Sequence, residues 1–484
     1  MPEPKFDSIV EAGAAASRPD QPANTEARPF SGHPARRPKA KSHTRFLVLG
    51  LIFFITVVNY ADRSSMSIAG HDMSKALGMT SVQLGFVFSA FSWAYVVSQL
   101  PGGYLLDKFG AKKVYGWSLT LWSLVTLAVG FVGLISTPVL ISVTVLFTLR
   151  LLLGVVEAPA FPANARIATM WFPTKERGRA AAIFNSAQYL ATAMFAPLLG
   201  WMTFTFGWRF GFFALSLLGI IMAVVWFGWM NVPSKHKRVT AAEIAIIRDG
   251  GGLVDLDESE TLKSKRVPVT RAQFAQLFTS RMFWGLYVAQ YAINALTYFF
   301  ITWFPIYLVS SRHLNILQAG FVAAIPALMG FAGGMLGGFV SDWMLRRGVS
   351  LTAARKIPSV IGMVLAMLIM LCPFTNSTPL IVLLMTAAFF GKGFAALGWA
   401  FATDMAPKEA NSVSAAIMNA IGNIAGIVTP IVIGFIIAAT GKFDIALWFV
   451  GAHGALALVG YVIMGRVKRL EFKPGTATST SVPV

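Results

Sequence analysis

Residues 46–68 read FLVLGLIFFITVVNYADRSSMSI. This run is long and apolar enough to cross a bilayer, because a membrane helix needs ~20 mostly apolar residues. With 56% hydrophobic and 13% charged residues, the chain is not an ordinary soluble domain. The long continuous runs also exclude a β-barrel, whose strands alternate over ~10 residues. We predict an all-α membrane protein with twelve transmembrane helices at 46–68, 82–106, 114–134, 138–164, 180–203, 210–232, 282–310, 318–340, 357–374, 379–403, 413–439 and 445–464.

Basic residues indicate the orientation of these spans. With the N-terminus inside, the short cytoplasmic loops hold 12 Lys and Arg and the short outer loops hold 4. This positive-inside bias predicts that both termini are cytoplasmic. The net charge of +19 is therefore assigned to topology and to contact with anionic membrane lipid rather than to nucleic acid. Residues 1–45 are predicted to be a disordered cytoplasmic tail and not a signal peptide, and 465–484 a second tail.

Two motifs recur along the chain at the same offset of about 235 residues. GGYLLDKFGAKK (102–113) returns as GGFVSDWMLRRG, and AAIFN (181–185) returns as AAIMN. Halves of six spans each are parallel repeats, which rock around a central site. We predict two pseudo-symmetric six-helix bundles at 46–232 and 282–464. Residues 233–281 are predicted to be a cytoplasmic loop between the bundles, with a flexible glycine-rich linker that lacks a phosphate-binding motif.

The first copy of the repeat places Asp107 at the cytoplasmic end of span two. A carboxylate there can hold a neighbouring helix end or a basic group, and can release it when the bundles move. We interpret the motif as a conformational latch; the alternative is an ordinary basic loop. The predicted latch residues are Gly103, Asp107, Lys112, Lys113 and Asp342.

Glycines and prolines predict local geometry within the spans. Gly330, Gly334 and Gly338 repeat every four residues, a spacing typical of close helix packing. Pro159, Pro162 and Pro305 are predicted to kink their helices.

Charged residues inside the spans are the strongest functional signal. Such residues are costly in hydrocarbon and usually face a cavity. Arg150 and Glu157 are nearly two helical turns apart, so they share one face. Desolvation favours the neutral carboxyl, which makes Asp62 and Glu157 candidate proton-coupling residues. The alternative is two structural ion pairs, in which each acid is held by an arginine.

Three cations within the spans are candidates for binding an anion. Arg63 and Arg150 carry permanently charged forks suited to a carboxylate. Lys392 lies 235 positions after Glu157, so the repeat places it on the opposite wall, where it suits a second carboxylate. The alternative is that Lys392 pairs with an acid or snorkels. Side chains suited to a polyhydroxylated substrate complete the predicted site: Tyr60, Tyr95, Gln188, Trp399 and Asn419.

Long motifs in the chain resemble a known family. They include NYADR (59–63), LRLLLGVVEAPAFPANARIATMWFP (149–173) and FFGKGFAALGWAFATDMAPKE (389–409). These resemble the anion:cation symporters of the major facilitator superfamily, and within it the bacterial D-glucarate/D-galactarate transporters. The resemblance covers roughly residues 44–473. It implies proton-coupled uptake of sugar diacids across the bacterial inner membrane by alternating access, with Arg150 at the substrate carboxylate and the buried acids in proton coupling.

The resemblance also separates possible substrates. The related galactonate branch is expected to carry Asn where this chain has Lys392, which favours a dicarboxylate. A symporter of galactonate, a hexuronate or another organic anion stays open, as does a sensor that does not transport. No metal-ligand spacing or nucleophile–base set is visible in the sequence, so an enzyme, a metal and a cofactor are not expected. We expect a monomer.

Overall fold

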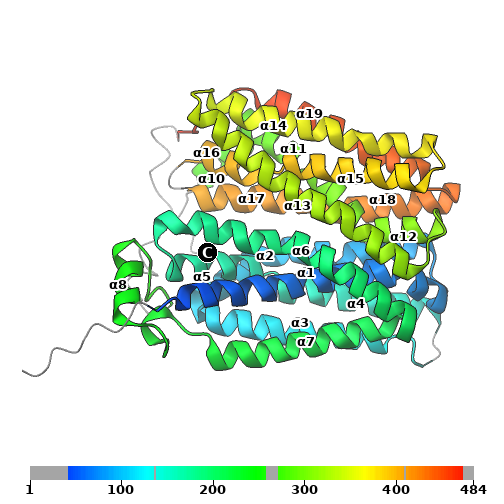
Figure 1. Ribbon diagram of the computed structural model, residues 1–484, viewed down its shortest axis with the longest axis horizontal. Coiled ribbons are helices and arrows are strands. Elements are labelled where there is room, and N and C mark those ends of the chain that lie inside the picture. The colour runs from blue at the N-terminus through cyan, green and yellow to red at the C-terminus, as the bar shows by residue number, and fades with distance from the viewer. Residues whose placement is uncertain (1–41, 136–137, 258–270, 408–409, 472–484) are drawn as a thin grey trace, which may run out of the picture. The chain divides into compact units, whose positions relative to one another are not determined.

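The computed structural model describes residues 42–135, 138–257, 271–407 and 410–471 (Figure 1). The chain divides into two units, Met1–Ala40 and Lys41–Val484, and every described helix lies in the second unit. Most of the predicted N-terminal tail and residues 472–484 of the predicted C-terminal tail lie outside the described residues.

Every regular element in the described part of the chain is a helix. Eleven helices there are long and apolar enough to cross a membrane. The twelfth span is a pair, α11 (Arg281–Thr302) and α12 (Phe304–Ser310), that bends by 47°. This confirms the prediction of an all-α, twelve-span membrane protein.

In the sequence, one set of helices comes before the central loop and a second set comes after it. Figure 1 shows the helices of each set gathered together. The first set is α1 (Thr44–Leu77), α2 (Ser81–Phe109), α3 (Ala111–Phe131), α4 (Val139–Glu157), α5 (Ala160–Trp171), α6 (Thr174–Phe206) and α7 (Trp208–Trp229). The loop contains η1 (Pro233–Lys235), α8 (Ala241–Asp249) and α10 (Arg271–Thr279). After α11 and α12 come α13 (Ile316–Arg346), α14 (Leu351–Ala366), η2 (Met367–Phe374), α15 (Thr378–Phe394), α16 (Gly398–Met405), α17 (Asn411–Asn423), α18 (Ala425–Thr440) and α19 (Asp444–Met464).

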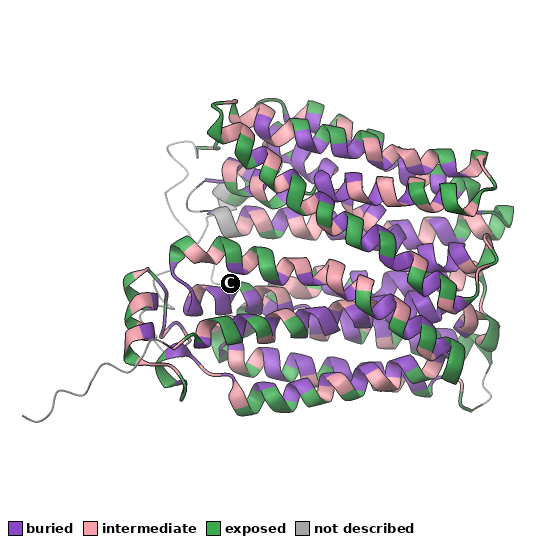
Figure 2. Ribbon diagram, in the orientation of Figure 1, coloured by how far each residue is buried: buried purple, intermediate pink, exposed green. Residues whose placement is uncertain are grey.

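The outward faces of the helices carry large exposed apolar side chains (Figure 2). Val97, Val224 and Val462 are 72%, 69% and 73% exposed. A soluble monomer rarely exposes so much contiguous apolar surface, whereas hydrocarbon solvates it. These faces are therefore the lipid contacts that the apolar runs predicted.

Helix breaks lie close to the predicted site. Span four stops at Glu157, and α5 resumes after Pro159, which cannot donate a hydrogen bond to the preceding turn. Pro305 stands at the start of α12, where the bend of span seven occurs. The breaks at Pro159 and Pro305 agree with the prediction, whereas Pro162 lies within α5 and its predicted kink stays a prediction. Span ten also breaks, between α15 and α16, soon after Lys392. The repeat thus carries a charged residue followed by a break in both halves.

The predicted glycine series on α13 is correct only in part. A Cβ on Gly330 would meet the ring of Phe389 at 2.6 Å, so that glycine permits close packing. A Cβ on Gly338 would meet nothing within 4 Å, and the prediction is wrong there. The close backbone approaches on this helix belong instead to Gly333 and Gly337, because the face of α13 against α15 is rotated from the predicted row.

Part of the central loop packs against the first set of helices. The buried carboxylate of Glu243, on α8, accepts hydrogen bonds from the backbone N–H groups of Thr44 and Arg45 at 3.2 and 3.1 Å. These are unpaired donors at the positive end of α1, so an acid is stabilised there. The prediction of a flexible linker is therefore wrong for 233–257. Residues 258–270 lie outside the described part of the chain.

Candidate functional site

The charged residues predicted inside the first half come together between α1 and α4. Asp62, Arg150 and Glu157 are only 3%, 5% and 0% exposed. The Nε of Arg63 donates to Oε2 of Glu157 at 2.9 Å, and both side chains are largely buried. A buried carboxylate is costly unless it is paired and hydrogen-bonded, and this contact provides such a pair. Of the two ion pairs considered from the sequence, the one at Glu157 is present.

Asp62 has a different partner. Its Oδ2 accepts a hydrogen bond from the hydroxyl of Thr126, on α3, at 2.5 Å, and both residues are buried. No arginine forms an ion pair with Asp62 among the described residues. The alternative of two acid–arginine pairs is therefore wrong for Asp62. Its carboxyl is held by a neutral hydroxyl, which can accompany either the charged or the protonated form.

Aromatic rings surround the two arginines. The Cζ of Arg63 lies 4.9, 4.5 and 4.9 Å from the ring centroids of Tyr60, Phe91 and Tyr95. The Cζ of Arg150 lies 5.5 Å from the same Phe91 ring. A ring face stabilises a guanidinium that lies over it, and the N–H donors in the plane of the guanidinium can still bond to other groups. The two cations are thus held in place without being neutralised by the rings.

Arg150 retains binding capacity. Its Nε is buried and has no hydrogen-bond partner in the described part of the chain. No described carboxylate lies within 4 Å of its guanidinium. A buried donor without a partner costs free energy, so the side chain is suited to an anion that arrives from outside the protein.

Lys392, near the end of α15, is 4% exposed. Its Nζ lies 5.1 Å from the ring centroid of Phe389 and 5.4 Å from that of Tyr189. Within the described ranges no acid forms an ion pair with it. The alternative in which Lys392 pairs with an acid therefore has no support there.

A small cavity lies beside Lys392. Its volume is about 20 Å³, and Tyr60, Gln188 and Lys392 are among its lining residues. The Tyr60 ring also lies under Arg63, so this wall of the cavity adjoins the arginine cluster. A cavity of this size holds about one water molecule. A six-carbon diacid does not fit, so these walls must move apart before such a molecule binds.

Of the remaining predicted substrate residues, Asn419 and Trp399 do not line this cavity, whereas Gln188 does. Asn419 donates from Nδ2 to Oε1 of Gln99 at 3.2 Å, which joins the two halves. Trp399 is 53% exposed and does not line the cavity with Lys392. Gln188 donates to the carbonyl of Asn185 at 3.1 Å. The roles of these residues in binding stay predictions.

The predicted latch is a charged network in each half. Asp107 pairs with Arg166 at 2.6 Å, and Arg166 pairs in turn with Asp257 of the central loop at 2.6 Å. In the second half, Arg355 bridges Asp342 and Asp404 at 3.0 and 2.8 Å. Both acids of the repeat thus hold a basic group, as the sequence analysis expected. Release of these contacts during transport stays a prediction.

The other predicted latch residues lie around this network. Lys113 is exposed, and Lys112 lines a separate pocket. A Cβ on Gly103 would meet nothing within 4 Å. The close approach belongs to its neighbour Gly102, where a Cβ would lie 3.2 Å from Pro159.

Comparison with known proteins identifies the family. The model of the Major Facilitator Superfamily matches residues 52–354. The chain belongs to the Major Facilitator Superfamily. It is 49% identical to a probable galactarate/D-glucarate transporter of Escherichia coli (strain K12), over 90% of this chain and 96% of that one. It is also 49% identical to a probable galactarate/D-glucarate transporter of Bacillus subtilis (strain 168), over 90% and 94%.

Solved structures agree with this assignment at the level of the fold. A bacterial homologue of the human lysosomal transporter Spinster, in an inward-facing and occupied conformation, aligns with a TM-score of 0.65 at 15% identity, over 88% of this chain and 97% of that one. The chain is therefore a multi-pass membrane transporter related to bacterial inner-membrane proteins, and it is not an enzyme.

The two halves of this facilitator meet closely near the ends of their spans that are predicted to face outward. A Cβ on Gly85 (α2) would lie 2.6 Å from the carbonyl oxygen of Pro430 (α18). A Cβ on Gly320 (α13) would lie 2.5 Å from the carbonyl oxygen of Ala196 (α6). Backbones approach this closely only where a side chain is missing. We call these two contacts the outer seal.

Three residues of the site were missed from the sequence. Thr126 holds Asp62, Phe91 stacks with both arginines, and Tyr189 stacks with Lys392. Phe91 stands one turn before the predicted Tyr95, and Tyr189 is next to the predicted Gln188. Those neighbours were the available signal for the two rings; nothing in the sequence singles out Thr126.

Proposed function

We propose that this facilitator takes up sugar diacids, D-glucarate and galactarate, together with protons across the bacterial inner membrane. The observation that carries the proposal is the 49% identity over 90% of the chain to probable galactarate/D-glucarate transporters. A sugar-acid anion follows from these relatives. Coupling to protons and action as a monomer are our additional proposals.

The arrangement of buried charge supports a diacid. Arg150 and Lys392 are buried on different halves, and neither has an acid partner in the described residues. One substrate carboxylate would bind the fork of Arg150, and the other the ammonium of Lys392. Tyr60, which contacts Arg63 and lines the cavity of Lys392, would contact the hydroxylated carbon chain. A monocarboxylate such as galactonate would leave one buried cation unpaired, which is costly.

Protons would enter through the two buried acids. Glu157 is paired with Arg63, so a proton on Glu157 would free that guanidinium for the substrate. Asp62 would take a second proton while it keeps its contact with Thr126. Loading both acids makes the site more cationic, and a dianion would therefore bind most tightly after the protons.

Transport would then proceed by alternating access. The bundles 46–232 and 282–464 would rock about the site, with the central loop 233–281 between them. The outer seal would open to admit substrate and close before release. The cytoplasmic networks at Asp107 and Asp342 would form and break in the same cycle.

The test is proton movement in proteoliposomes that contain the full chain. We expect D-glucarate to drive external alkalinisation, and Lys392→Asn to weaken the response to glucarate more than the response to D-galactonate. Lys75→Asn, an exposed lysine at the outer end of α1, is the matched control. Absence of proton movement with any sugar acid contradicts symport. Glucarate-driven movement unchanged by Lys392→Asn keeps symport and excludes Lys392 as the second anchor.

A further inference from the structure

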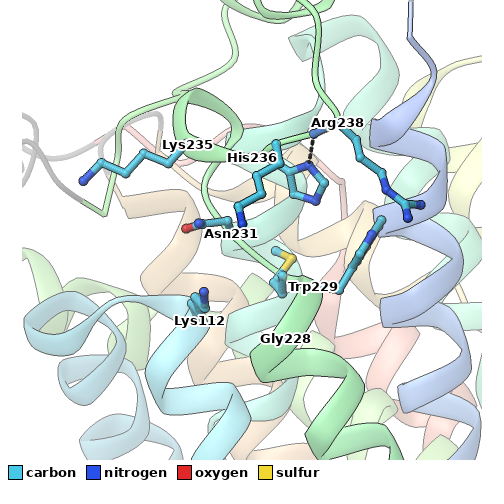
Figure 3. A pocket seen from close by; sticks show the side chains of 9 residues that line it. Lys112, Gly228, Trp229, Asn231, Lys235, His236 and Arg238 are labelled. Atoms are coloured by element: carbon cyan, nitrogen blue, oxygen red, sulfur yellow. Dashed lines mark hydrogen bonds between the residues drawn. The ribbon is translucent and has the colours of Figure 1, made fainter.

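A second cavity lies away from the transport site, where span six enters the central loop. It has a volume of about 250 Å³ (Figure 3). The end of α7, the segment that follows it and one residue of α3 enclose it. The lining residues are Lys112, Gly228, Trp229, Met230, Asn231, Lys235, His236, Lys237 and Arg238.

The charge of this cavity has one sign. Four of its nine lining residues are Lys or Arg, and none is acidic. Cations gathered around a concave surface reinforce one another's potential and favour an anion there. The amide of Asn231 and the backbone of the segment supply further polar groups. The four cations come from two separate parts of the chain, α3 and residues 235–238.

The wall of the cavity is a built structure. The imidazole of His236 is 7% exposed and packs edge-on against the rings of Trp171 and Trp229, at centroid distances of 5.3 and 5.0 Å. The indole of Trp226 donates to the carbonyl of Lys112 at 2.8 Å, which fixes the start of α3 beside the cavity. A cluster of solvated surface lysines has no such support.

A backbone contact orients the ring of His236 at this wall. The backbone N–H of Arg238 donates to its Nδ1 at 3.3 Å, as drawn in Figure 3. The neutral ring therefore carries its proton on Nε2. That atom is buried and makes no well-formed hydrogen bond to any described residue, although the carbonyl of Trp229 is close enough to favour the protonated ring.

The location indicates the chemical class of the ligand. The cavity lies at the cytoplasmic end of α7, beside Trp229, and Trp is enriched where the membrane meets water. Basic pockets between transmembrane helices on the cytoplasmic side bind the headgroups of acidic lipids. A phosphate group has the charge and the several acceptor oxygens that Lys and Arg recognise.

We propose that this cavity binds the phosphate group of an anion, and that the occupant ties residues 231–238 of the central loop to the start of α3. Two sources offer this chemistry: the phosphodiester of an acidic glycerophospholipid, and soluble phosphate. The inference does not depend on the transported substrate, because no residue of the transport cavity lines this one.

The test uses the full chain in detergent, with melting temperature and native mass spectrometry as readouts. One arm adds phosphatidylglycerol, one adds phosphatidylcholine, and one adds inorganic phosphate at matched ionic strength. The variant Lys237→Gln/Arg238→Gln removes two exposed cations of the cavity. The control Lys175→Gln/Arg346→Gln removes two exposed cytoplasmic cations elsewhere. Melting without additives shows whether each protein is folded.

We expect phosphatidylglycerol to raise the melting temperature of wild type and control. In the mass spectra, the fraction of protein that retains this lipid should be at least tenfold larger for wild type and control than for the cavity variant. An equivalent response to inorganic phosphate alone would assign the site to the soluble source and also support the proposal. Stabilisation by phosphatidylglycerol that is equal in all three proteins, or no response to either phosphate, would overturn it. Neither result bears on glucarate transport.

Discussion

Asp62 is held by a hydroxyl rather than by a cation, and this contact should matter for proton release. Thr126→Val keeps the shape of the side chain and removes the donor to Asp62. A hydrogen bond to a charged group contributes ~1.5–3 kcal/mol, so the charged carboxylate becomes harder to form. We expect net glucarate uptake to fall about tenfold or more, since ~1.4 kcal/mol corresponds to tenfold. Glucarate exchange, which needs no proton release, should be largely kept.

Two comparisons make this prediction specific. Thr126→Ser retains the hydroxyl and should retain uptake. If Thr126→Val lowers uptake and exchange by the same factor, Thr126 acts on folding or binding rather than on the proton step. Both rates are measured with radiolabelled glucarate in the same proteoliposomes.

His236 should make stability depend on pH. Burial, and then the neighbouring Arg238 cation, lower the pKa of His236 below its ordinary value of 6.5; Lys112 acts in the same direction, while the Trp229 carbonyl and Glu243 oppose it. The folded protein then binds this proton more weakly than the unfolded chain. Stability therefore rises with pH up to about 6.5 and is lost as the pH falls through the lowered value.

The measurement is the melting temperature between pH 5 and pH 7.5. We expect His236→Gln to reduce the loss of stability at acidic pH relative to wild type. His43→Gln, an exposed histidine just before α1, is the control and should follow wild type. Identical pH profiles for wild type and His236→Gln would contradict the assignment.

Individual charges could be predicted from sequence because a span tolerates few of them. Asp62, Glu157 and Lys392 stand out in apolar runs, and all three are buried in the structure. Their partners could not be predicted. Thr126 is one of many hydroxyls in the helices and lies 64 positions from Asp62, and a helical Thr usually bonds to its own backbone, as Thr120 does to Gly116.

At the scale of elements, Asp257 is one of the residues that fix the central loop to the first set of helices. Asp257 pairs with Arg166 and accepts a hydrogen bond from the backbone N–H of Ala111, at the start of α3, at 2.7 Å. Loss of one member of a buried, hydrogen-bonded ion pair costs ~3–5 kcal/mol. We expect Asp257→Asn to lower the melting temperature by several degrees and to expose residues 233–257 to protease.

The chain offers a matched control two residues away. Asp255 pairs with Arg248 at 3.5 Å, and both side chains are well exposed, so this ion pair should contribute little. Asp255→Asn should leave melting and proteolysis as in wild type. Equal effects of the two substitutions would show that the loop responds to charge in general and not to the contact with Arg166.

The sequence could not show this clamp for a physical reason. Helical periodicity and apolar run length indicate which residues face lipid or core, and they predicted the spans. Asp257 and Glu243 lie in a polar segment without a clear helical periodicity of apolar residues. In such a segment, the sequence does not distinguish an acid that caps a distant helix from an acid exposed to solvent. Their burial becomes visible only once α1 and α3 are in place.

At the scale of the whole molecule, the repeat relates the two walls of the site. The offset of about 235 residues places Lys392 opposite Glu157, and in both halves the span breaks shortly after the charged residue. Broken helices with charged residues near the membrane midplane are typical of transporter sites. The symmetry could be predicted from the sequence, but the close contact between the outer ends could not. The sequence alone does not show which glycines lie where helices of the two halves touch.

The outer seal gives a test of the transport cycle as a whole. Gly320→Val would place a side chain against the Ala196 carbonyl oxygen, which a Cβ alone would approach to 2.5 Å. The clash exists only while the outer ends are together, so the substitution should favour the state that is open to the outside. We expect glucarate uptake to be lost while glucarate still binds.

A cysteine at Thr192, which lines the cavity of Lys392, should then react with an impermeant thiol reagent in a Cys372→Ser background. Gly338→Val is the control on the same helix, since a Cβ there meets nothing within 4 Å; it should keep uptake and leave the cysteine protected. Loss of uptake without labelling in Gly320→Val would mean that the contact between α6 and α13 is structural and does not gate the outer path.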